Sequence, residues 1–200
     1  MKKCRVLFLS ANPTNAQTLH LDEETREIRN KIRAAEYRDT LEFIPILAVR
    51  AADLQQALLE YRPHIVHFSG HGTSSAEIVL KDQGGEARPV SKEALTQTFK
   101  LLKDRIRLVI LNSCFSAPQA EAIVEVIDCA IGMKAALSDK AAITFTAAFY
   151  RAIGFGQPIQ TAFDLGKNQL ALEGFAGHDI PELLSRTAVD PSSIQPLDRS

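Results

Sequence analysis

Two reactive side chains stand at the ends of apolar segments, where they could work as a pair. His71 lies between Gly70 and Gly72 and directly follows one such segment. Cys114 follows a second apolar segment and precedes a stretch with helical spacing. An imidazole can take the proton of a thiol, and the resulting thiolate is a strong nucleophile. The pattern therefore predicts nucleophilic acyl transfer, with His71 as general base and Cys114 as nucleophile.

The backbone around the two residues suits the same chemistry. A helix that begins just after Cys114 would bring backbone N–H groups and a partial positive charge near the thiol, which favours the thiolate. Glycines on both sides of His71 permit tight turns and the close approach of a substrate chain. The N–H groups of Gly72 and Cys114 are suited to hold an oxyanion. Gly72 is therefore a third candidate catalytic residue, through its backbone.

Each of these residues also has a purely structural interpretation. A lone cysteine at a strand end is commonly a small core residue, and a histidine in a glycine-rich turn is commonly a polar cap. His67 alternates with apolar neighbours, so we expect a buried imidazole with satisfied hydrogen bonds, or a residue that positions His71. Cys129, inside another apolar run, is expected to be a core thiol. From the residues alone, both interpretations of the His71–Cys114 pair stay open.

The segments that would position the pair alternate between strand and helix. We expect strands at residues 4–10, 41–49, 64–69, 106–112 and 128–133, a hairpin of 77–80 with 87–90, and helices at 21–36, 51–62, 91–102, 117–126, 138–153 and 158–172. Strands that are apolar throughout are typical of a mainly parallel α/β sheet covered by helices on both faces. Sites in such folds lie at the carboxyl ends of the strands. His71 and Cys114 would therefore emerge side by side if their strands are neighbours.

The composition narrows the classes of partner. The chain has 200 residues, 46% hydrophobic and 24% charged, which is typical of one soluble globular domain. A net charge of −1 argues against nucleic acid or an anionic membrane surface as the main partner. The apolar runs are too short or too interrupted to span a bilayer.

Cysteine and histidine usage bears on location and cofactors. The three cysteines are an odd number in apolar surroundings, which argues against a disulfide framework and favours a reducing cytoplasm. No His/Cys spacing resembles a zinc site, and the glycine motifs lack the rest of a nucleotide-binding fingerprint. We expect no metal and no organic cofactor. The charged run at 21–36 is expected to be a solvated helix face.

Residues 67–72 (HFSGHG) and 111–116 (LNSCFS) resemble the motifs of the CHAT family, a bacterial caspase-like group related to separases and caspases. Similar segments cover most of residues 4–190 and include 7–13, 21–24, 130–133, 138–142, 148–152 and 156–159. The resemblance implies a caspase-like three-layer sandwich. It also implies the base at His71, the nucleophile at Cys114 and oxyanion donors at the amides of Gly72 and Cys114.

In the separase-like branch of this group, an acidic residue after the fifth strand receives the basic side chain of the substrate. Asp139 is the candidate here, by its place between Ser138 and Lys140. A carboxylate in a pocket would pair with Arg or Lys. The same residues also fit a helix start, with Ser138 as the cap and Asp139 in the first turn. Both interpretations of Asp139 stay open.

The resemblance implies a cytoplasmic cysteine endopeptidase that cleaves a specific protein after a basic residue, in a bacterial signalling or defence system. It leaves room for a regulatory protein partner. We expect the peptidase domain at residues 1–175, and at 176–200 a tail or linker packed in part on it. One alternative is a non-catalytic caspase-like module that binds partner proteins. A weaker alternative, a flavodoxin-like ligand-binding domain, lacks a Ser/Thr/Gly cluster for phosphate.

Overall fold

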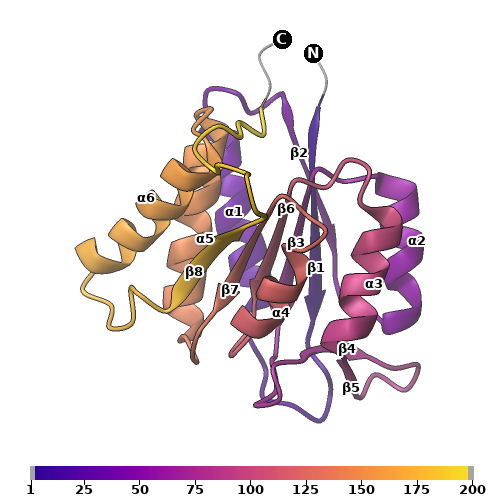
Figure 1. Ribbon diagram of the computed structural model, residues 1–200. Coiled ribbons are helices and arrows are strands. Elements are labelled where there is room, and N and C mark those ends of the chain that lie inside the picture. Colours follow the sequence, from indigo (N-terminus) through magenta and orange to yellow (C-terminus); the bar gives the residue numbers. More distant parts are fainter. Residues whose placement is uncertain (1–2, 198–200) are drawn as a thin grey trace.

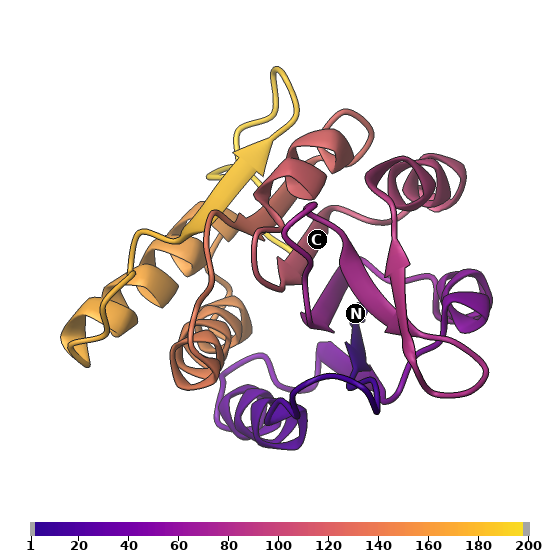
Figure 2. The same cartoon turned by 90° about the horizontal axis from the view of Figure 1, so that it is seen from below.

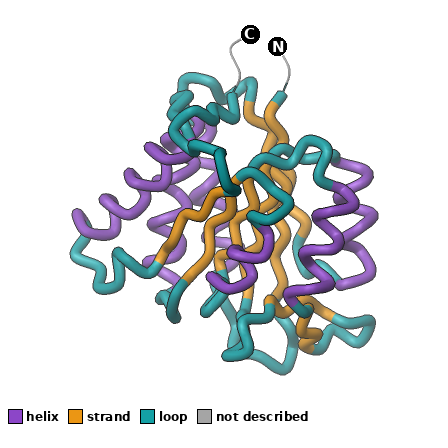
Figure 3. The backbone as a smooth tube through the Cα atoms, viewed as in Figure 1, coloured by secondary structure: helices purple, strands orange, loops and turns teal. Residues whose placement is uncertain are grey.

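A computed structural model of the protein describes residues 3–197 as alternating strands and helices (Figures 1 and 3). The strands are β1 (Cys4–Ala11), β2 (Leu41–Ile46), β3 (Ile65–Gly70), β4 (Ile78–Lys81), β5 (Ala87–Val90), β6 (Leu108–Asn112), β7 (Cys129–Met133) and β8 (Pro181–Ser185). The helices are α1 (Leu21–Arg33), α2 (Ala51–Tyr61), α3 (Lys92–Leu102), α4 (Ala117–Ile123), α5 (Asp139–Gly154) and α6 (Ile159–Leu172).

The main sheet has the strand order β2-β1-β3-β6-β7-β8. Its first five strands are parallel to one another, and β8 pairs with β7 in the antiparallel sense. Helices α1, α5 and α6 cover one face, and α2, α3 and α4 cover the other (Figures 1 and 2). The predicted α/β three-layer sandwich with a mainly parallel sheet is confirmed.

The strands divide their side chains between two cores because successive residues point to opposite faces. In β1, Val6 and Phe8 pack with α1, α5 and α6, whereas Leu7 and Leu9 pack with α2 and α3. All four side chains are at most 2% exposed. A strand buried on both faces needs apolar residues at every position, which explains the unbroken apolar runs in the sequence.

The structure departs from the sequence predictions at a few boundaries and at one strand. Helix α1 ends at Arg33 rather than at residue 36, and α4 ends at Ile123 rather than at residue 126. Strand β8 was not predicted, because residues 176–200 were expected to form a tail or linker. It begins at Pro181, and a proline is tolerated at the first position of an edge strand because no ladder donor is lost there.

The small hairpin formed by β4 and β5 lies at the carboxyl ends of the parallel strands, at the bottom of Figure 1. Isolated bridges tie it to the main body, between Arg50 and Lys81 and between Gly72 and Ile78. The second bridge joins the hairpin to the glycine-flanked turn that follows β3. Within residues 3–197, no helix combines the length and apolar character needed to cross a membrane.

Candidate active site

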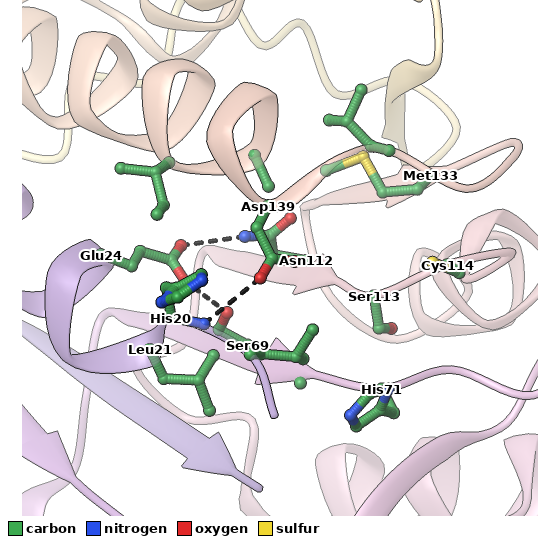
Figure 4. A pocket seen from close by; sticks show the side chains of 15 residues that line it. His20, Leu21, Glu24, Ser69, His71, Asn112, Ser113, Cys114, Met133 and Asp139 are labelled. Carbon is green, nitrogen blue, oxygen red and sulfur yellow. Dashed lines mark hydrogen bonds between the residues drawn. The ribbon is translucent and has the colours of Figure 1, made fainter. Parts of the chain in front are cut away.

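His71 and Cys114 emerge at the same height from two neighbouring parallel strands. The register of β3 and β6 pairs Ser69 with Asn112. His71 and Cys114 each lie two residues beyond that pair. Both line one pocket of about 60 Å³, together with Asp139 (Figure 4). The structure therefore brings together the three side chains that the sequence singled out as candidate base, candidate nucleophile and candidate substrate-binding acid.

Gly72 packs directly against the backbone of Cys114. A Cβ atom added to Gly72 would lie 2.0 Å from the carbonyl oxygen of Cys114 and 3.2 Å from its nitrogen. Only glycine can be accommodated at such a distance. Among residues 3–197, the N–H groups of Gly72 and Cys114 have no hydrogen-bond acceptor. The two predicted oxyanion donors thus lie close together, with both N–H groups available.

The imidazole of His71 is oriented by a backbone carbonyl. Its Nε2 lies 2.6 Å from the carbonyl oxygen of Gln17, in the loop between β1 and α1. A carbonyl only accepts, so Nε2 carries the hydrogen and Nδ1 is left as the basic nitrogen. Sequence reasoning missed Gln17, because the contact uses the main chain and any residue type could supply it.

A buried hydroxyl holds the turn that carries Cys114. The Oγ of Ser116 donates to the carbonyl of Leu111 at 2.7 Å and accepts from the N–H of Met133 at 3.0 Å. Phe115 adopts a left-handed backbone conformation with φ of 57°, which turns the chain sharply before α4. As predicted, a helix begins shortly after Cys114, at Ala117.

The three cysteines differ in accessibility. Cys4 and Cys129 are buried, and Cys114 is half-buried. Burial raises the pKa of both the Cys4 and the Cys129 thiol to about 12. These two thiols are therefore protonated and inaccessible at neutral pH, as expected of core residues, whereas Cys114 opens onto the pocket.

Asp139 both begins a helix and lines the pocket. Ser138 caps α5, since its Oγ accepts from the N–H of Ala141 at 3.4 Å. Asp139 begins the helix, and its carboxylate accepts from the N–H of His20 at 3.3 Å. Asp139 is also one of the residues that line the pocket containing Cys114. A helix start and a place in the pocket are thus compatible.

Glu24 also lines this pocket, and sequence reasoning missed it. Its side chain accepts hydrogen bonds from the hydroxyl of Ser69 and from Asn112 Nδ2 at 2.9 Å (Figure 4). It also accepts one from Thr146 Oγ1 at 3.1 Å. Burial raises the pKa of Glu24, the three hydrogen bonds oppose that rise, and the nearby charge of Asp139 adds to it.

The expectation of a solvated face at 21–36 was wrong at this position, because Glu24 is only 2% exposed. The position of Glu24 relative to the apolar residues of the helix could have revealed its burial. Glu24 lies three residues after Leu21 and four before Ile28, both of which are buried. Residues at such intervals share one face of a helix, so Glu24 belongs to the inward face.

His67 is buried, as expected, but only one of its ring nitrogens is satisfied. Its Nδ1 lies 3.1 Å from the hydroxyl of Tyr150, and the two rings stack with centroids 5.7 Å apart. Burial lowers the pKa of His67 to about 3, so the ring is neutral. Its Nε2 lies 3.6 Å from Glu24 Oε1 and has no hydrogen-bond partner among residues 3–197. No described hydrogen bond joins it to His71.

The part of the chain that the structure describes contains no group of three or more His, Cys, Asp or Glu side chains arranged to hold a metal ion.

The model of the CHAT domain matches residues 2–172, which is most of the chain. The chain belongs to the CHAT domain family. A Roc-COR-CHAT protease from an unknown prokaryotic organism is 28% identical to this CHAT domain over 195 residues, covering 90% of the chain and 18% of the relative. A probable protease from Gillisia limnaea is 28% identical over 147 residues, covering 72% of the chain and 26% of the relative.

A Roc-COR-CHAT protease from Runella zeae is 27% identical to the CHAT domain over 151 residues, covering 74% of the chain and 16% of the relative. The chain thus spans roughly a quarter or less of the length of these three relatives.

Two solved structures share the fold of the CHAT domain. A secreted C11 cysteine protease from Bacteroides thetaiotaomicron, in complex with an irreversible peptide inhibitor, has a TM-score of 0.63 at 9% identity and covers 91% of this chain and 66% of its own. The Arg-specific cysteine proteinase gingipain R has a TM-score of 0.64 at 13% identity and covers 96% of this chain and 47% of its own. The CHAT domain therefore has a caspase-like fold.

Proposed function

We propose that this CHAT domain is a cysteine endopeptidase that uses a His71–Cys114 dyad. The observation that carries the proposal is the register of β3 and β6, which sends both side chains into one pocket from adjacent strand ends. One fold can carry many functions, so the arrangement of the base and the nucleophile is a better guide to activity than the fold alone. The relatives named as proteases support the same reaction class.

The proposed reaction has two stages. His71 takes the thiol proton of Cys114, and the thiolate attacks the carbonyl carbon of the scissile peptide bond. The N–H groups of Gly72 and Cys114 donate to the resulting oxyanion. The C–N bond then breaks, and His71 returns the proton to the leaving amine. A water molecule hydrolyses the thioester with His71 again as base, which restores the free thiol.

We propose that cleavage follows a basic residue, with Asp139 as an acceptor for its side chain. Two points support this: Asp139 lines the same pocket as Cys114, and a carboxylate pairs well with a guanidinium or ammonium group. The proposed substrate is a specific protein in a bacterial signalling or defence system, cut in the cytoplasm. The relatives are several times longer than the part matched by this chain, and we propose that a regulatory protein partner or domain controls the peptidase.

Hydrolysis of fluorogenic peptides ending in Arg, Lys, Asp or Leu tests the proposal. We expect the native protein to cleave after Arg or Lys, Cys114→Ala to be inactive, and Asp139→Asn to lose preference for basic residues. Turnover retained by Cys114→Ala would refute the dyad. Cleavage after Asp or Leu alone would keep the peptidase and reject the basic pocket. No turnover, together with no labelling of Cys114 by a peptide-directed electrophile, would favour the non-catalytic module.

A further inference from the structure

The buried carboxylate of Glu24 has no counter-cation. Within residues 3–197 no Lys or Arg forms an ion pair with it, and the nearby His67 is neutral. Its hydrogen bonds come only from uncharged donors, namely Ser69, Asn112 and Thr146. A carboxylate removed from water without a cation is costly, because neutral donors replace only part of its hydration. The site would gain from a cation that enters through the pocket.

A second group in the same pocket is also left without a partner. The hydroxyl of Ser113 is buried, with the residue only 4% exposed, and it has no hydrogen-bond partner among residues 3–197. Ser113 lines the pocket between Cys114 and His71 (Figure 4). Buried hydroxyls normally find a partner, so this unfilled capacity independently indicates a polar ligand group in the pocket.

We propose that Glu24 is the deep acceptor of an arginine side chain whose guanidinium bridges Glu24 and Asp139. This inference rests on the proposed peptidase function and assigns a specificity-determining residue to it. Glu24 Oε1 already accepts from Asn112 and Thr146, whereas Oε2 accepts only from Ser69. Each carboxylate oxygen has two lone pairs, so Oε2 retains one free position.

The arrangement discriminates between the two basic side chains. A guanidinium carries five donors in a planar fork and can reach two carboxylates at once. An ammonium group concentrates its three donors at one point, so lysine would engage one acceptor well and leave the other unfilled. Arginine is therefore the substrate residue that both Glu24 and Asp139 can satisfy.

The test compares kcat/KM for otherwise identical peptides ending in Arg, Lys or Leu. Glu24→Gln keeps the size of the side chain and removes its charge. Since a hydrogen bond to a charged group contributes about 1.5–3 kcal/mol, the Arg-over-Leu ratio should fall roughly 10- to 150-fold. Glu24→Asp keeps the charge and should retain part of the Arg preference. Glu23→Gln makes the same change at the adjacent exposed acid and should leave the ratio as in the native protein.

The outcomes separate this inference from the proposed function. An Arg-over-Leu ratio that is unchanged in Glu24→Gln would overturn the role of Glu24 while leaving the peptidase intact. If the native protein cleaves no peptide and a peptide-directed electrophile does not label Cys114, the peptidase proposal fails. Calorimetric binding of an Ala-Ala-Arg amide to Cys114→Ala then decides the role of Glu24. Binding that weakens at least tenfold when Glu24→Gln is added supports it, and unaltered or absent binding overturns it.

Discussion

The backbone of Gly72 contacts that of Cys114 so closely that a Cβ at position 72 would lie 2.0 Å from the carbonyl oxygen of Cys114. This contact fixes the turn after β3 against the turn after β6. His71 and Cys114 belong to those two turns, so their relative position is set by main-chain packing. The proposed base and nucleophile are thereby positioned before any substrate binds.

Gly72→Ala tests that contact. We expect the added methyl group to force the two turns apart, which should lower the free energy of unfolding by about 1–3 kcal/mol. Displacement of the proposed oxyanion donors should also reduce kcat/KM at least about tenfold, because catalysis is sensitive to misplacement of about 1 Å. Gly84→Ala in the hairpin is the matched control, since its nearest neighbour would be the Asp82 side chain at 3.4 Å. Equal behaviour of the two variants in urea unfolding and turnover would contradict the account.

Two buried serines in the turn that carries Cys114 form a matched pair. Ser116 bridges Leu111 and Met133, whereas the Ser113 hydroxyl has no partner among residues 3–197. Ser116→Ala leaves a buried carbonyl and a buried N–H unsatisfied, so we expect a loss of about 1–3 kcal/mol in the free energy of unfolding. Ser113→Ala removes no hydrogen bond and eliminates an unpaired buried hydroxyl, so it should leave the free energy of unfolding unchanged or raise it. Similar melting temperatures for the two variants would show that the bridge does not stabilise the turn.

His67 should make stability depend on pH. Its pKa falls from 6.5 to about 3 on folding because burial disfavours the charged ring. Between those values the unfolded chain binds a proton that the folded protein does not, so the free energy of unfolding falls as the pH falls. The slope from this one group approaches about 1.4 kcal/mol per pH unit below pH 6.

The comparison that isolates this effect is urea unfolding of native protein and His67→Gln between pH 7 and pH 5. The variant loses the hydrogen bond to Tyr150 at every pH, but its stability deficit should shrink as the pH falls. Glu24, which lies 3.6 Å from His67, has a raised pKa that acts in the opposite direction because its contribution is lost as the pH rises. Subtraction cancels only carboxylates that do not contact His67. His178→Gln, at an exposed histidine, should follow the native pH dependence. A deficit of constant size would contradict a neutral buried His67.

Much of the fold could be predicted because the residues of each central strand form a largely apolar run, which can be recognised without knowledge of the strand's neighbours. The apolar runs that became β1, β3 and β6 carry their own signal, and the strand-end rule then placed His71 and Cys114 at one edge. Strand β8 carries little signal, since its residues after Pro181 are only half-buried or exposed. Its assignment depends on pairing with β7, which is a tertiary contact.

The parts of the site that were missed depend on three-dimensional packing. Gln17 acts through its carbonyl, so its residue type gives no signal. Glu24 stands beside the exposed acids Asp22 and Glu23 and was grouped with them, although its helical spacing places it inward. Polar residues on an inward face break the usual pattern, and such breaks often mark functional positions.

The most direct test of the central claim is the rate of Cys114 alkylation by iodoacetamide, followed by mass spectrometry across pH 5–9, in native protein and His71→Ala. Cys4 and Cys129 are buried, so the label reports on Cys114. If His71 and Cys114 form a catalytic pair, the native protein should react faster than His71→Ala near neutral pH, because His71 accepts the thiol proton. Identical pH profiles for the two proteins would contradict the pair.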